Sequence, residues 1–291
     1  MGVERNELYG SCSKGKMESK VDRKSQDPQV NISAMDLSTP PPVSATSQQF
    51  SVMGMPVHLR DEYPGWLCDR LAQGQGTHVV TLNTEMIMLA ETTPELARVI
   101  HQAELVIPDG AGVVLYLRLY GVHIARHPGI ELAEALLQRA AQTSPALSIF
   151  CFGGEPGVTE TAMANMQQRF PGLNVVGTEH GFHPPEAEAA MLERLAALQP
   201  QLILVGLGVP RQEYWIAQHR HLCPQAIWVG VGGSFDIWAG RKFRAPLWLR
   251  NHNLEWVYRL YKEPWRWRRM LALPRFAWRA LIDRVAKKFR R

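Results

Sequence analysis

Residues 202–213 read LILVGLGVPRQE, and this stretch decides the fold. The run LILVGL is apolar on both faces of an extended chain, which is typical of a parallel strand that helices cover on both sides. A turn with two glycines follows, and a helical period begins at Gln212. A strand, a glycine turn and a helix in this order predict an α/β fold.

The same succession recurs along most of the chain. Short β-branched runs predict strands at 78–82, 104–107, 147–152, 173–178, 202–206 and 226–230. Helical periods separate them at 84–91, 111–120, 158–170, 186–198 and 212–221. We therefore predict a mostly parallel, doubly wound, Rossmann-like sheet with helices on both faces.

Composition divides the 291 residues into three regions. Residues 1–49 are rich in Ser, Lys, Gln and Pro, so they cannot bury enough apolar surface to offset an ordering cost of about 1 to 2 kcal/mol per residue. We predict a disordered extension there, either a spacer or a regulatory segment. Residues 50–245 are predicted to form the α/β core. Residues 246–291 carry 13 Lys and Arg against 3 Asp and Glu and are predicted to form a basic helical appendage.

Several classes of protein are disfavoured by the sequence. No apolar run approaches the roughly 18 to 20 residues of a membrane-spanning helix, and the N-terminus lacks the apolar core of a secretory signal. The cysteines Cys12, Cys68, Cys151 and Cys223 lie far apart without a C-x-x-C pair, as expected of reduced packing residues. We therefore expect a cytoplasmic protein.

Polar and glycine-rich segments follow the predicted strands, at the end of the sheet where open α/β proteins bind ligands. Free N–H groups in such turns favour an anion such as the phosphate of a nucleotide or a sugar. For any single motif, a tight turn without a ligand is the alternative. The candidate substrate-binding residues are Gly153, Gly154, Gly206, Gly208, Gln212, Gly232, Gly233 and Asp236.

The common nucleotide and metal motifs are missing from the sequence. Neither G-x-x-x-x-G-K-[ST] nor G-x-G-x-x-G occurs, which disfavours a P-loop NTPase and a dinucleotide dehydrogenase. No D-x-D pair or His/Asp cluster has metal-ligand spacing. We expect no metal and no cofactor, so that backbone N–H groups and arginines would neutralise a bound phosphate.

Asp109 is the acidic residue whose position most strongly indicates a role in a site. It follows the apolar run 105–107 and precedes a predicted helix. A carboxylate at that position is either a helix N-cap or a catalytic group, and the sequence leaves both interpretations open. The same ambiguity applies to Asp236 and, as a cap, to Asn83.

The C-terminal region contains five of the nine tryptophans. Trp278, Leu281, Ile282, Val285 and Phe289 fall on one helical face, and basic residues lie elsewhere on the helix. This pattern favours attachment to an anionic membrane surface. Domain packing and nucleic-acid binding are the alternatives, although nucleic acid would need less Trp and Leu on one face.

Seven segments, in order and spacing, resemble the WecG/TagA/CpsF glycosyltransferases. They are TLNTEMIMLA, IPDGAGVVL, FGGEPGVTETA, VGTEHGF, VGLGVPRQEYW, GVGGSFDIWAGRKFRAPLWLR and LEWVYRLYKEPWRWRR, within about residues 52–271. The resemblance implies an inverting, metal-independent transfer of N-acetylmannosamine or a related sugar. The donor would be a UDP-sugar and the acceptor a polyprenyl-diphosphate-linked N-acetylglucosamine at the inner face of the cell membrane.

The resemblance also implies roles for individual residues. Asp109 matches the proposed general base, and Thr81 and Asn83 match positions that hold the sugar. Gln212 and Asp236 match positions that line the UDP pocket. The arginines of the family's C-terminal appendage, which is thought to close over the site at the membrane, match Arg259, Arg266 and Arg269.

The chain departs from the family pattern at 126–132, where RHPGIEL stands in place of V-x-G-x-D-L, with Pro128 in the loop and Glu131 for Asp. This departure concerns the acceptor more than the reaction. Arg211 replaces a common Lys. A non-catalytic nucleotide-sugar-binding scaffold at the membrane is the rival interpretation. The apolar face of the appendage also predicts self-association when no bilayer is present.

Overall fold

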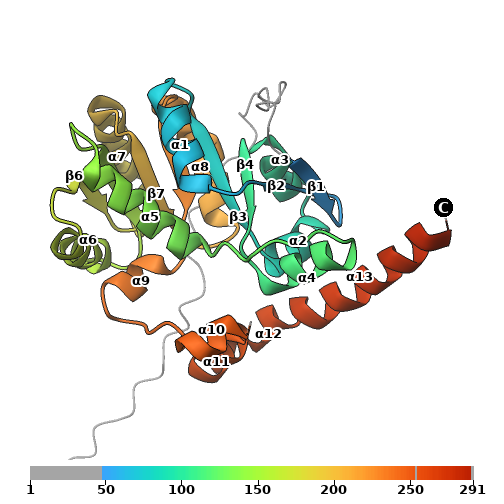
Figure 1. The fold of residues 1–291 in the computed structure, drawn as a ribbon. Helices are drawn as coiled ribbons and strands as arrows, with labels where there is room; N and C mark the ends of the chain where they lie inside the picture. The colour runs from blue at the N-terminus through green and yellow to red at the C-terminus, as the bar shows by residue number, and fades with distance from the viewer. Residues whose placement is uncertain (1–47, 253, 290–291) are drawn as a thin grey trace, which may run out of the picture.

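Six parallel strands form the central sheet of the computed structural model, which describes residues 48–252 and 254–289 (Figure 1). Their order in the sheet is β4-β3-β8-β7-β5-β6, and every neighbouring pair is parallel. The strands are β3 (Thr77–Leu82), β4 (Leu105–Pro108), β5 (Ser148–Gly153), β6 (Asn174–Glu179), β7 (Leu202–Gly206) and β8 (Ile227–Gly230). The predicted parallel sheet is confirmed, and no strand end differs from its predicted position by more than one residue.

Helices cover both faces of this sheet because alternate strand residues point to opposite sides. On β3, Val79 packs into one core cluster and its neighbour Val80 into another. One face is covered by α1 (Tyr63–Ala72), α5 (Gly129–Gln142), α6 (Val158–Arg169) and α9 (Ser234–Trp238). The other face is covered by α2 (Thr84–Ala90), α3 (Pro94–Gln102), α4 (Ala111–Leu119), α7 (Pro185–Leu198) and α8 (Arg211–His219). The short 3-10 helix η1 (Arg220–Leu222) follows α8. The fold is therefore doubly wound, as predicted.

An antiparallel hairpin that was not expected from the sequence lies beside the β4 edge of the sheet. It consists of β1 (Gln48–Val52) and β2 (Met55–Leu59). The ring nitrogen Nδ1 of the buried His58 accepts a hydrogen bond from the N–H of Val106 on β4 at 2.9 Å. The hairpin begins at Gln48, two residues before the predicted core boundary. The rest of the predicted extension, residues 1–47, lies outside the described residues.

The C-terminal region is a chain of helices that runs past the lower edge of the core (Figure 1). It comprises α10 (Leu247–Asn251), α11 (Glu255–Lys262), η2 (Pro264–Arg266), α12 (Trp267–Met270) and α13 (Ala272–Phe289). The predicted helical appendage is confirmed. None of the described helices is both long enough and apolar enough to cross a membrane.

The sequence predicts an apolar stripe on α13 that includes Trp278, Leu281, Ile282 and Val285. The helix packs on α2 and α4 through its other face. Phe276 and Ala280 are buried in the cluster that contains residues of α2 and α4. The hydroxyl groups of Tyr116 and Tyr120 on and after α4 donate to the carboxylate of Asp283 at 2.5 and 2.7 Å. The stripe on the opposite side is solvent-exposed at Trp278, Leu281, Ile282 and Val285.

Candidate active site

Asp109 lies beyond the carboxyl end of β4, beside the end of β3. Its backbone N–H donates to the carbonyl of Leu82 at 3.0 Å, because Leu82 and Pro108 pair across the two strands. Helix α4 starts at Ala111, and its N-cap is Gly110 rather than Asp109. The N-cap interpretation of Asp109 is therefore wrong, and the side chain is available for another purpose.

Three further segments close around Asp109. Thr81, the penultimate residue of β3, is almost completely buried, and a Cβ placed on Gly129 would lie only 2.8 Å from its methyl group. The start of α5 can therefore approach β3 this closely only with glycine at 129. Asn83 caps α2, and its Oδ1 accepts from the N–H of Met86 at 3.0 Å. The cap interpretation of Asn83 is confirmed, and the amide NH₂ of its side chain can still donate to a sugar.

The surroundings of Asp109 raise the pKa of its carboxyl group from 3.8 to about 6. Burial raises the pKa most, and Glu255 raises it further. Arg259, Arg126 and a hydrogen bond from the backbone N–H of Gly129 act in the opposite direction. A carboxylate with a pKa near neutral can both accept and release a proton at physiological pH.

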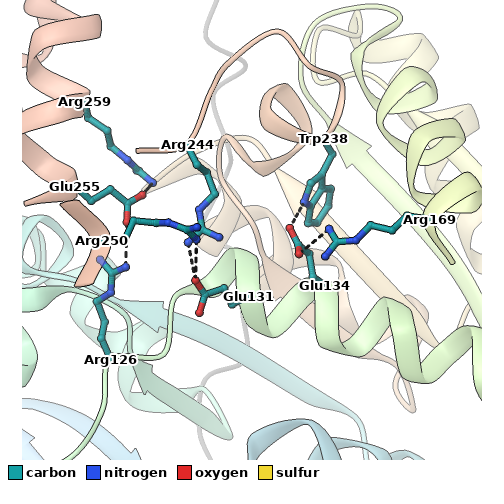
Figure 2. A network of polar contacts seen from close by, with 9 residues as sticks. All are labelled: Arg126, Glu131, Glu134, Arg169, Trp238, Arg244, Arg250, Glu255 and Arg259. Atoms are coloured by element: carbon teal, nitrogen blue, oxygen red, sulfur yellow. Dashed lines mark hydrogen bonds and ion pairs between the residues drawn. The ribbon is translucent and has the colours of Figure 1, made fainter. Parts of the chain in front are cut away.

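Two arginines reach this region from different parts of the chain and meet at Glu255 (Figure 2). Nη2 of Arg126, in the loop before α5, lies 3.0 Å from Glu255 Oε2. Nη2 of Arg259, one turn further along α11, lies 2.8 Å from Glu255 Oε1. The appendage therefore brings a guanidinium group and a carboxylate into the electrostatic environment of Asp109.

Glu131, which stands where the family pattern has Asp, lies next to this cluster (Figure 2). Its Oε1 lies 2.7 Å from Arg244 and 3.5 Å from Arg250. The Nε atoms of both arginines are buried without a hydrogen-bond partner among the described residues. Guanidinium groups are thus concentrated on the side of the site where the appendage joins the core.

Gln212 is 2% exposed at the start of α8, and its side chain is held on both sides. Its Oε1 accepts from the N–H of Gly232 at 3.0 Å, and its Nε2 donates to Glu213 Oε1 at 2.9 Å. The other oxygen of Glu213 lies 2.9 Å from Nε2 of the buried His78. Gln212 therefore fixes the glycine turn after β8, which is a structural role beside any contact with a ligand.

The candidate glycines have different surroundings at the ends of β5, β7 and β8. A Cβ on Gly153 would lie 2.5 Å from the backbone of Gly206, and the φ of Gly153 is +138°, so packing of the two strands requires glycine there. A Cβ built on Gly206 would lie 2.5 Å from the ring of Phe235. These two positions are explained without a ligand. The remaining candidates lie in the turns that follow the same strands, namely Gly154, Gly208, Gly232 and Gly233.

Asp236 lies in the first turn of α9 and links the core to the appendage. Its Oδ2 lies 3.1 Å from Nζ of Lys242, and the same Nζ lies 3.2 Å from Glu263 at the end of α11. The side chain of Asp236 is 25% exposed to solvent. It therefore remains accessible to a polar ligand at this end of the sheet.

Comparison with known proteins shows the family of the chain. The family model described as "Glycosyl transferase WecG/TagA/CpsF family" matches residues 50–290. The chain belongs to this family. It is 37% identical to an N-acetylglucosaminyldiphosphoundecaprenol N-acetyl-beta-D-mannosaminyltransferase of Bacillus spizizenii over 207 residues, which are 71% of this chain and 79% of the relative.

A protein of the same name from Bacillus subtilis is 33% identical to this chain over 214 residues. The match covers 73% of this chain and 82% of the relative. The resemblance inferred from the seven sequence segments is thereby confirmed. The protein is a glycosyltransferase of the WecG/TagA/CpsF family.

The three arginines expected from this family do not share one environment. Arg259 acts electrostatically on Asp109. Arg269 forms an ion pair with Glu85, two residues after Asn83 on α2, at 2.5 Å. Arg266 ends η2, but its side chain lies outside the described part of the chain. The structure thus brings Arg259 to the base candidate and Arg269 to the neighbouring helix.

Two charged residues near Asp109 were not singled out from the sequence. Glu255 precedes Arg259 by four residues on a helix, a spacing that predicts an ion pair. Arg126 opens the segment that departs from the family pattern. Within the described residues, no group of three or more His, Cys, Asp and Glu side chains has the arrangement of a metal site.

Proposed function

We propose that this protein transfers N-acetylmannosamine, or a related sugar, from UDP to a polyprenyl-diphosphate-linked N-acetylglucosamine. The reaction would take place on the inner face of the cell membrane during synthesis of a cell-surface polysaccharide. One observation carries the proposal: Asp109, with a pKa raised to about 6, shares its surroundings with Arg126 and with Arg259 of the appendage. The two Bacillus relatives are named as N-acetylmannosaminyltransferases that act on N-acetylglucosaminyldiphosphoundecaprenol, which supports the same sugar and acceptor.

The proposed chemistry is a single displacement with Asp109 as the general base. The acceptor hydroxyl oxygen attacks the anomeric carbon, and its proton passes to a carboxylate oxygen of Asp109. The bond between the anomeric carbon and the diphosphate oxygen breaks, and UDP leaves with the electron pair. One displacement inverts the anomeric configuration, so a single base is sufficient.

Charge builds on the departing diphosphate in the oxocarbenium-like transition state. Arg259 is the guanidinium that the described structure brings near Asp109 from the appendage, and Arg126 approaches from the core. We assign them, with Arg266 and Arg269, to that charge, in a reaction that needs no metal. A charge-assisted contact made only in the transition state contributes about 2 to 4 kcal/mol.

Attachment to the membrane is part of the proposal. The appendage exposes the aromatic side chains Trp248, Trp265 and Trp278 at 61%, 72% and 66%. Tryptophan favours the interfacial zone of a bilayer, and each nearby Lys or Arg gains roughly 1 kcal/mol from anionic lipid. The lipid acceptor and Arg259 would then be held at the same surface. Self-association through the same apolar stripe remains a prediction.

The Asp109→Asn variant separates transfer from mere binding. We expect it to bind UDP as the wild-type protein does, while transfer to a short-chain lipid diphosphate falls by at least a hundredfold. Unchanged transfer would refute the base assignment. A wild-type protein that binds UDP-sugar but transfers nothing would favour the scaffold interpretation.

A donor screen tests the substrate directly. UDP-N-acetylmannosamine, its uronic acid, UDP-N-acetylglucosamine and UDP-glucose are each incubated with the short-chain acceptor and EDTA. We expect transfer from UDP-N-acetylmannosamine, with EDTA having no effect. Transfer only from another donor would replace the proposed sugar, and loss of activity in EDTA would contradict a metal-independent reaction.

A further inference from the structure

Glu255 is a buried carboxylate at the junction of the appendage and the core. It is 7% exposed, at the first position of α11. A charge withdrawn from water to this extent requires partners, because desolvation of an unpaired carboxylate is costly. Its partners are Arg126 from the core and Arg259 from its own helix, one on each oxygen.

The two ion pairs have different consequences. The pair with Arg126 joins the first turn of α11 to the loop before α5. Helix α5 begins directly after this loop at Gly129, which packs against Thr81. The pair with Arg259 acts on a side chain that is 48% exposed. Packing leaves such a side chain several rotamers, and the hydrogen bond to Glu255 Oε1 selects one of them.

The same carboxylate takes part in the electrostatics of Asp109. Arg259 and Arg126 lower the pKa of Asp109, whereas Glu255 raises it. Burial raises the pKa of Glu255 itself, but Arg259, Arg126 and Arg244 together hold it below its usual value, so the group is ionised. Glu255 thus offsets part of the positive charge that would otherwise make Asp109 a weaker base.

We propose that Glu255 is a positioning residue for glycosyl transfer, which clamps Arg126 and Arg259 in place and sets the charge balance around Asp109. It touches neither substrate nor the reacting atoms in this scheme. It acts through the two arginines, and it makes docking of α11 on the core a condition for placing Arg259. The inference rests on the proposed function, since it assigns Arg259 and Asp109 their roles there.

The test compares Glu255→Gln, Glu255→Asp and the wild-type full-length protein. Glutamine keeps the shape of the side chain and removes its charge, so both arginines lose their ionic partner. We expect kcat for Glu255→Gln to fall at least tenfold. The acid limb of the kcat/KM profile should move to lower pH, because Asp109 loses a negative neighbour. Glu255→Asp retains the charge and should restore the position of the acid limb.

Glu91→Gln is the matched control. Glu91 also joins the core to the appendage, through an ion pair with Arg279 of α13 at 3.1 Å. We expect this variant to keep the wild-type kcat and acid limb. An equal shift in Glu91→Gln would overturn the inference, because any appendage ion pair would then suffice.

Three results separate this inference from the proposed function. A wild-type protein without transfer activity contradicts the function itself. An active wild-type protein with an unaltered Glu255→Gln variant overturns only the role of Glu255. A Glu255→Gln variant that loses thermal stability but keeps its acid limb also overturns it, since Glu255 would then be structural alone.

Discussion

Gln212 and Glu213 are hydrogen-bonded side chain to side chain at 2.9 Å, although they are neighbours in the chain. A carboxylate accepts and does not donate, so the bond requires the NH₂ group of Gln212 to face Glu213. The carbonyl oxygen of Gln212 is thereby turned toward the N–H of Gly232. The glycine turn after β8 is held through this pair, and His78 holds the pair from β3.

Gln212→Glu is expected to disrupt this turn. The substitution places a second carboxylate against Glu213 in a buried position and removes the donor that Glu213 accepts. We expect the free energy of unfolding to fall by about 1 to 3 kcal/mol and the affinity for UDP to fall with it. Chemical denaturation and UDP titration check both effects. Wild-type stability in this variant would show that the turn does not depend on the Gln212 amide.

The pH dependence of transfer is expected to follow Asp109. A general base must be deprotonated, so kcat/KM should fall as the pH drops below about 6, the raised pKa of this group. An ordinary exposed aspartate would keep its activity to about pH 4. A pH profile with the short-chain acceptor distinguishes the two, and an acid limb near 4 would contradict the burial effect described for Asp109.

The raised pKa of Asp109 also predicts how stability changes with pH. The change has the opposite sign to that of an ion-paired aspartate, whose pKa is lowered in the folded state. Because the folded pKa is above the unfolded value of 3.8, the folded state binds the proton more tightly, and stability falls as pH rises from about 4 to 6. Asp109→Asn removes this titration. We expect the variant to be more stable than wild type at pH 8, by about 1 to 3 kcal/mol, and equal to it near pH 4. Urea denaturation at the two pH values measures the difference.

The strands and the glycine turns that follow them could be predicted because each depends on local sequence. The run LILVG is apolar on both faces of an extended strand, and this can be read from the five residues alone. Each glycine turn follows its strand directly in the sequence. Asp109 was singled out for the same reason. The sequence could not exclude Asp109 as the N-cap, because it does not fix the first residue of the following helix. The structure shows that α4 starts at Ala111 and that Gly110 is the cap.

Contacts between distant segments could not be predicted in this way. Arg126 and Glu255 are 129 residues apart, and no local pattern states that they meet. The buried face of α13 was also missed, because Phe276 and Ala280 give a weaker pattern than the Trp278 stripe on the other side. The β1–β2 hairpin was missed because its strands of five residues join a segment of very different composition.

Arg259→Ala is expected to slow transfer by tens to hundreds of times, because a contact worth about 2 to 4 kcal/mol in the transition state is lost. Arg259→Lys keeps the charge without the planar fork and should recover only part of the rate. Steady-state kinetics with saturating donor measures both. Arg169→Ala is the control: this arginine is also ion-paired, with Glu134 at 2.9 Å, but on the surface of α6. A wild-type rate in Arg259→Ala would remove this residue from the mechanism.

The exposed stripe of α13 is expected to bind anionic vesicles. In Trp278→Ser/Ile282→Ser, two side chains that are exposed at 66% and 48% lose their apolar surface, so folding stability should stay within about 0.5 kcal/mol of wild type. Burial of such side chains in a bilayer interface contributes about 1.5 to 3 kcal/mol each, so affinity for phosphatidylglycerol vesicles should fall at least tenfold. Phe276→Ser, on the buried face, should instead reduce stability. Vesicle sedimentation of the double variant at the wild-type level would assign membrane binding to another surface.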